Sequence, residues 1–135
     1  MMPTPDERLR ILMALTRPER GADAFHRAVA LLSSLPGIAG SAVYQPGAMV
    51  TSAGDAGDET HLAALAEYVL ASGSRYAEQG LYAGPVRCRD AASAVLLVAF
   101  HLPKPLPTLW QDFLDAVARQ LALLTSAGGG TGPGA

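Results

Sequence analysis

The stretch Ala94 to Leu102 reads Ala-Val-Leu-Leu-Val-Ala-Phe-His-Leu, and it is apolar on both sets of alternating positions. A β-strand with this pattern must be covered on both faces of its sheet. A buried helix is the alternative, but nine residues between a turn and a proline favour a strand. The sequence therefore predicts a central strand. Its two faces are lined by Val95, Leu97 and Ala99 and by Leu96, Val98 and Phe100.

The length and composition of the chain indicate one domain with more apolar surface than its own core can bury. A chain of 135 residues can bury a sizeable core without disulfides. Because 50% of the residues are hydrophobic and 16% are charged, part of the apolar surface should meet a pocket or a partner, most simply in a homodimer. We expect a single domain over residues 1–125 and a disordered Gly-rich tail over residues 126–135.

Charge and cysteine content restrict the partners. The net charge of -2 and ten scattered basic residues argue against nucleic acid and anionic membranes. Cys88 is the single cysteine, which leaves no Cys-based zinc site and fits a reducing cytoplasm. The first residues do not resemble a signal peptide, and no apolar run approaches the roughly 18 residues of a membrane helix. We expect a cytoplasmic protein without cofactor or metal.

Two helices and a hairpin are expected next. Thr4 and Glu7 have the spacing of a capping box, which predicts a helix over residues 4–17. A second helix is predicted over residues 22–35. A hairpin should follow, with strands at 38–44 and 48–53, and then a helix over 59–72. The N-cap of that helix is predicted to be Asp58 or Thr60.

The segment from Arg75 to Gly84 is the least regular, because it could extend the preceding helix or form a loop with an edge strand. Side chains with polar tips on apolar bodies gather there, which suits a small-molecule pocket as well as an ordinary core edge. The pocket candidates are Tyr68, Arg75, Tyr76 and Tyr82.

A short strand over residues 86–89 is predicted to open at Pro85. If Val86 and Cys88 point inward, Cys88 is a structural core residue. Arg87 and Arg89 then face either an anionic ligand or water, and we favour a solvated edge.

The last helix is predicted over residues 108–124, after a proline-rich connector. Its apolar stripe is wider than one sheet face can cover, so part of it should meet another subunit or the N-terminal helices. The candidates for a dimer interface are Leu12, Trp110, Phe113, Leu114 and Leu121.

This order of elements describes an α+β fold, in which an antiparallel sheet of about five strands carries helices on both faces, GAF-like or profilin-like. The chain resembles a GAF domain in three stretches: Leu35 to Tyr44 entering the hairpin, Gly84 to Phe100 as paired late strands, and Leu109 to Leu124 as the closing helix. The resemblance implies a sensory or regulatory module. Such modules often dimerise through terminal helices and can bind small molecules between sheet and loops.

The same chain is also similar to the roadblock/dynein light chain family, through residues 35–54 and the helix that follows. That resemblance implies a dimeric scaffold or regulator of a small GTPase. Two features count against it: an extra N-terminal helix, and two apparent late strands where the family has three.

No catalytic constellation stands out. The chain has no Gly-x-Ser-x-Gly motif, and His26, His61 and His101 lie far apart in the sequence. One group resembling GAF domains reduces free methionine sulfoxide with several cysteines, and Cys88 has no such partner. The sequence therefore predicts a non-catalytic regulatory module, not an enzyme, that binds a small molecule or a protein in a signalling or stress pathway.

Overall fold

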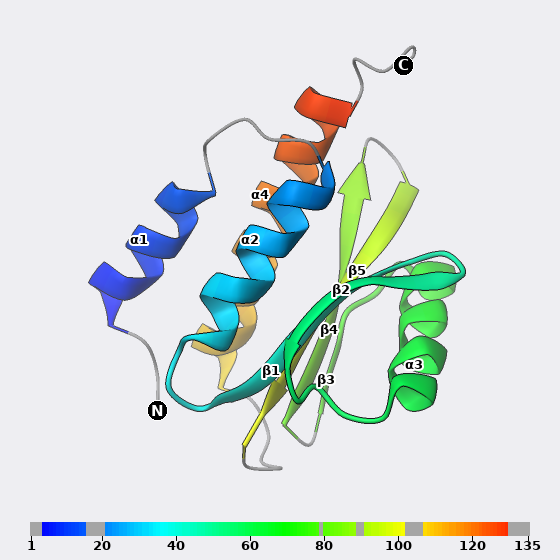
Figure 1. Ribbon diagram of the computed structural model, residues 1–135, viewed down its shortest axis with the longest axis horizontal. Coiled ribbons are helices and arrows are strands. Elements are labelled where there is room, and N and C mark those ends of the chain that lie inside the picture. Colours follow the sequence, from blue (N-terminus) through cyan, green and yellow to red (C-terminus); the bar gives the residue numbers. More distant parts are fainter. Residues whose placement is uncertain (1–3, 16–20, 79, 89–90, 102–106, 130–135) are drawn as a thin grey trace.

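The computed structural model describes residues 4–15, 21–78, 80–88, 91–101 and 107–129. A five-stranded antiparallel sheet separates helices α1, α2 and α4 on one face from α3 on the other (Figure 1). In chain order the elements are α1 (Pro5–Ala14), α2 (Gly21–Ser33), β1 (Ile38–Gln45), β2 (Ala48–Gly54), α3 (Glu59–Ser72), β3 (Tyr76–Glu78), β4 (Leu81–Cys88), β5 (Ala91–Phe100) and α4 (Thr108–Gly129). The predicted fold class is confirmed.

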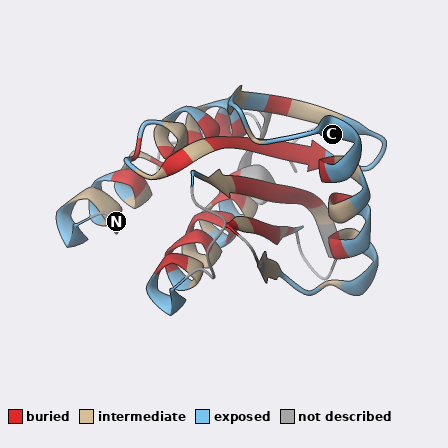
Figure 2. Cartoon of the chain, turned by 90° about the horizontal axis from the view of Figure 1, so that it is seen from below, coloured by how far each residue is buried: buried red, intermediate tan, exposed pale blue. Residues whose placement is uncertain are grey.

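β5 is the middle strand of the order β2-β1-β5-β4-β3, as its apolar pattern predicts. Leu96 and Val98 are fully buried beneath α2 and α4, whereas Val95 and Leu97 are fully buried beneath α3. Figure 2 shows that buried residues follow the strands and the helix faces that cover them. The sheet thus has two cores, one on each face.

The N-terminal helix begins as the sequence predicts. The Thr4 amide donates to Glu7 Oε1 at 2.8 Å, and the Glu7 amide donates to Thr4 Oγ1 at 3.1 Å, which completes the capping box. α1 ends at Ala14 with Leu15 as its C-cap, and residues 16 and 17 of the predicted helix lie outside the described residues. Asp58 is the N-cap of α3, although its side chain makes no capping hydrogen bond.

The late strands correct the sequence analysis. β4 begins at Leu81, so the predicted strand over residues 86–89 is too short, and Pro85 lies inside the strand. A proline is tolerated there because β3 pairs only with residues 81–83. Beyond that point no described strand pairs with the outer edge of β4, so the missing N–H of Pro85 leaves no gap in a ladder. The side chain of Cys88 and all of Arg89 lie outside what the structure describes.

α4 also differs from expectation. Its backbone continues to Gly129, four residues into the predicted disordered tail, because no proline interrupts its hydrogen bonds after residue 125. Residues 130–135 lie outside the described part of the chain.

The proposed dimer-interface residues are the larger correction. α1, α2 and the sheet together cover the wide stripe of α4, so most of these side chains belong to the protein's own core. The exposed fractions are 3% for Trp110, 5% for Phe113 and 0% for both Leu114 and Leu121, while Leu12 is half-buried. Trp110 packs edge-on against Phe100, with ring centroids 4.9 Å apart. Of the two expected partners for the stripe, the structure shows the N-terminal helices.

Candidate ligand groove

An open groove of about 580 Å³ lies between β4 and α4, next to the start of β3. We call it the β4–α4 groove. Its polar lining consists of Arg75, Arg87, Asp115 and Arg119, and its apolar lining of Pro85, Ala118, Ala122 and Leu123.

Two local features of the sequence form this groove. On α4, positions 115, 118, 119 and 122 follow helical spacing and therefore share one face. On the sheet side, β3 is only three residues long, which leaves the far half of β4 uncovered by another strand. The groove occupies the space along that open edge.

A buried tyrosine connects the groove to the core. Tyr82 is fully buried on β4, and its hydroxyl donates to Asp115 Oδ1 at 2.7 Å. Arg75 forms an ion pair with the other carboxylate oxygen of Asp115. Burial raises the pKa of Tyr82 well above its usual value, and the hydrogen bond and negative charge of Asp115 raise it further. Both oxygens of Asp115 are thus engaged within the protein.

Gly84 makes room for the Tyr82 ring. The two residues lie on the same face of β4, and a Cβ added to Gly84 would overlap the hydroxyl oxygen and Cζ of Tyr82. Only glycine allows so close an approach.

Replacing Gly84 by alanine should therefore lower the free energy of unfolding by about 1–3 kcal/mol, because the buried ring must move and lose its bond to Asp115. Chemical denaturation measures this change. In a Tyr82→Ala background the same glycine replacement should cost less, since the ring is absent. Equal costs in the two backgrounds would contradict the close contact.

Arg87 and Arg119, the other two arginines of the groove, form no ion pair in the described chain. Arg87 donates from Nη2 to the carbonyl oxygen of Gly73, the residue that ends α3. Arg119 is exposed on α4, and no hydrogen bond or ion pair joins it to another part of the described chain. With three arginines and one aspartate in its lining, the groove has a net charge of +2.

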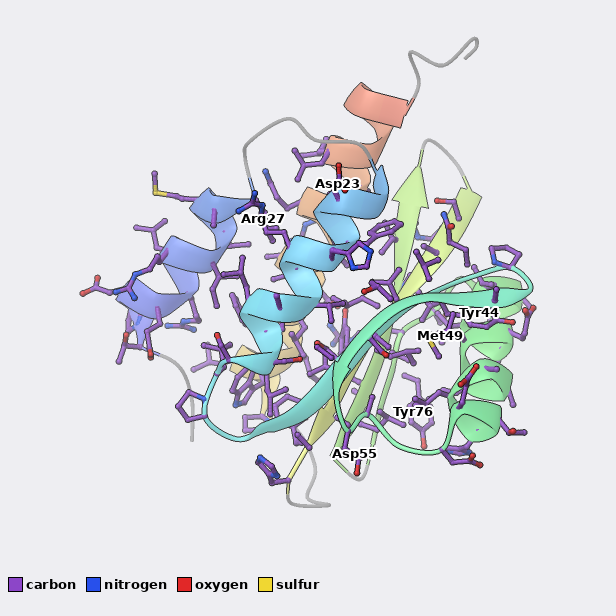
Figure 3. All side chains as sticks on the ribbon, viewed as in Figure 1. Asp23, Arg27, Tyr44, Met49, Asp55 and Tyr76 are labelled. Atoms are coloured by element: carbon purple, nitrogen blue, oxygen red, sulfur yellow. The ribbon has the colours of Figure 1, made fainter. Side chains whose placement is uncertain are left out.

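The four predicted pocket residues are divided between the two faces of the sheet. Arg75 lines the groove, and Tyr82 supports it from below through Asp115. Tyr76 packs with the core beneath α3, and Tyr68 is 59% exposed on α3 itself. Figure 3 shows Tyr76 and Tyr44 on the α3 side of the sheet. The prediction that all four form one pocket is therefore wrong.

Glu67 is exposed on α3, and its carboxylate has a partner on the same side of the sheet. Its Oε2 accepts a 2.7 Å hydrogen bond from the Tyr44 hydroxyl, and this bond raises the pKa of Tyr44. This hydrogen bond joins α3 to β1.

Among the charged residues of the groove, sequence reasoning missed Asp115 and Arg119 and favoured a solvated edge for Arg87. The available signal was a pair of opposite charges four positions apart within an apolar helix. Across the described ranges, no group of three or more metal-binding side chains comes together. No helix in the described parts of the chain is long and apolar enough to cross a bilayer.

Comparisons with known proteins find solved structures with a similar fold, but no match to the sequence among family models or curated proteins. No family model and no curated protein matches the chain. Among solved structures, the GAF domain of an Acinetobacter phosphoenolpyruvate-protein phosphotransferase is 14% identical with a TM-score of 0.77, over 94% of this chain and 95% of that one. The corresponding domain from Coxiella burnetii is 11% identical with a TM-score of 0.74, over 95% and 98% of the two chains.

An enzyme has the same fold. Free methionine-R-sulfoxide reductase from Neisseria meningitidis, in complex with its substrate, is 10% identical with a TM-score of 0.77, over 97% of this chain and 96% of that one. The prediction that the chain is not an enzyme, which we drew from the lack of a catalytic constellation, is therefore wrong, because enzymes also have this fold and the fold alone leaves the activity open.

The structure also bears on the choice between the two resemblances, to GAF domains and to the roadblock/dynein light chain family. The structure has three late strands, β3, β4 and β5, which removes one argument against the roadblock family. The matching solved structures nevertheless include GAF proteins from several bacteria, with TM-scores up to 0.77. At identities of 10–14% this likeness concerns the fold alone. The chain has a GAF-like fold.

Proposed function

We propose that this chain is a regulatory or sensory module that binds a small molecule in the β4–α4 groove. The observation that carries the proposal is the groove itself. Its volume of about 580 Å³ falls within the roughly 300–1,000 Å³ typical of ligand sites, and charged groups converge beside an apolar wall. The likeness to GAF domains supports a binding role by analogy of fold. A single cysteine supports a cytoplasmic location.

The side chains around the groove are held in place before any ligand arrives. Arg75 and Tyr82 fix Asp115 from two sides, and Arg87 is held by the carbonyl of Gly73. Preorganised groups lose little conformational freedom on binding, which favours affinity for a small ligand.

The position of the groove also suits a regulatory role. A ligand there would contact α4 and, through Arg87, the end of α3 on the opposite face of the sheet. Binding would therefore involve two helices that lie on opposite faces of the sheet, α4 and α3.

We further propose that the module is a homodimer formed by the surface between α1 and α4. Leu9 and Leu109 are each 57% exposed there and border a groove of about 350 Å³. Arg8 and Asp112 line the same groove, so a two-fold axis would place each charge opposite its complement on the second copy. This surface replaces the buried residues proposed from the sequence.

The ligand site is tested by titrating the ¹⁵N-labelled protein with a library of acidic, neutral and basic metabolites. Bound compounds should shift the amide signals of Arg87, Ala118 and Ala122, which line the groove. The variant Ala122→Phe should abolish this binding by filling the groove. The matched control Ala30→Phe, on the exposed side of α2, should leave it unchanged.

Two results would contradict the proposal. Shifts confined to the core beneath α3 would place the ligand on the other face of the sheet. Binding that survives Ala122→Phe with unchanged affinity would show that the groove is not the site.

A further inference from the structure

We propose that the ligand of the β4–α4 groove is a small organic anion, a carboxylate or a phosphate ester, whose charged group binds Arg87 and Arg119. This inference rests on the proposed function of the groove and adds the chemical class of its ligand. Three features of the lining lead to it: the local charge, the free donors and the apolar wall.

The charge of the groove is opposite to that of the chain. The whole sequence has a net charge of -2, whereas the groove lining combines three arginines with one aspartate. A concave site of one sign raises the local concentration of ligands of the other sign. The groove therefore favours anions in a protein that otherwise repels them.

Asp115 does not compete for the remaining arginines. Its two carboxylate oxygens bind Tyr82 and Arg75, and no hydrogen bond or ion pair in the described chain joins Asp115 to Arg87 or Arg119. These two arginines can therefore meet a ligand. A guanidinium group has five N–H donors. Arg87 uses Nη2 on the Gly73 carbonyl, and no hydrogen bond or ion pair joins Arg119 to the described chain. Such forked donors match the paired oxygens of a carboxylate or a phosphate.

The rest of the lining indicates an organic body on the anion. Pro85, Ala118, Ala122 and Leu123 form an apolar wall beside the arginines. Burying hydrocarbon there adds affinity that a bare inorganic ion cannot gain. The volume of the groove also exceeds what a single phosphate fills.

Protection of the open edge of β4 against pairing with another chain explains only part of the groove lining. Pro85 and Arg87 lie on the open edge of β4, where a proline and a charge discourage pairing with another chain. Arg119 lies on α4 and has no edge to protect. Its place beside Arg87 in the same groove is what an anion site requires.

Five probes test the inference by amide-shift titration in 150 mM salt: phenyl phosphate, phenylacetate, phenylacetamide, benzylamine and inorganic phosphate. The two aromatic anions should shift the groove signals and bind at least tenfold more tightly than the neutral amide or the amine. Inorganic phosphate should bind more weakly than phenyl phosphate, because it does not use the apolar wall. The relative affinity of the two aromatic anions separates a carboxylate ligand from a phosphate ester.

Variants separate a specific site from general charge. Arg119→Gln should weaken phenyl phosphate binding at least tenfold, with a nearly unchanged melting temperature because Arg119 is exposed and no hydrogen bond or ion pair joins it to the described chain. Arg10→Gln is the matched control. Arg10 is exposed on α1, so its replacement removes the same charge far from the groove lining. It should change the Kd less than twofold.

The experiment distinguishes a failure of the anion inference from a failure of the proposed function. Groove binding of phenylacetamide as tight as that of phenylacetate overturns the anion inference and leaves the proposed function standing. An equal loss in Arg10→Gln and Arg119→Gln overturns the assignment to these arginines. If no probe at 5 mM shifts the groove signals while a library metabolite of another charge does, the anion class is wrong. If nothing shifts them, the proposed function fails as well.

Discussion

Replacing Leu114 by glutamate is expected to unfold the protein. Leu114 is fully buried on α4, among residues of α2, the sheet and α4 itself. A carboxylate placed there has no partner, and the effective penalty for such a charge is several kcal/mol. The total stability of a domain is only about 5–15 kcal/mol. Far-UV circular dichroism should show the loss of the cooperative thermal transition.

The same substitution at Leu109 is the control. Leu109 is 57% exposed in the first turn of α4, where a negative charge favours the helix dipole. Leu109→Glu should therefore keep the fold, and it should reduce a wild-type dimer to a 14.0 kDa monomer if the α1–α4 surface is the interface. A folded Leu114→Glu protein would show that α4 does not pack as described.

The parts of the fold that the sequence predicts well are those encoded by neighbouring residues. The capping box of Thr4 and Glu7 is complete within four positions, and the alternation in β5 identifies a two-sided strand by itself. The extent of β4 is not encoded locally. Ala83, Gly84 and Pro85 read as loop residues, and they form a strand because β5 pairs with them. Tertiary pairing overrides propensity there.

The same distinction explains the partial prediction of the site. Arg75 and Tyr82 were predicted from the polar tips of side chains in an irregular segment. Their common partner Asp115 lies on α4, 40 positions from Arg75 and 33 from Tyr82. Alternation alone suggested that Arg87 faces water. The arginine cluster appears only when α4 is placed beside the open edge of β4. No local pattern carries that information.

High pH should destabilise the protein through Tyr82. In the unfolded chain this hydroxyl ionises near pH 10, whereas in the folded protein burial and Asp115 raise its pKa above that value. Above pH 10 the unfolded state therefore binds fewer protons than the folded state, and stability falls as pH rises. One such tyrosine lowers the free energy of unfolding by about 1.4 kcal/mol per pH unit within this window. Tyr44, whose pKa is raised by Glu67, acts in the same direction.

Tyr82→Phe should make the alkaline loss of stability shallower by that amount, although it costs about 1 kcal/mol at neutral pH through the lost hydrogen bond to Asp115. Denaturant titrations at pH 8, 10 and 11 measure both effects. Tyr68→Phe is the matched control, because it removes the hydroxyl of a tyrosine that is 59% exposed on α3. It should follow the wild-type curve. If Tyr82→Phe follows that curve too, the hydroxyl of Tyr82 reaches water in solution, and the buried link between the core and the β4–α4 groove does not exist.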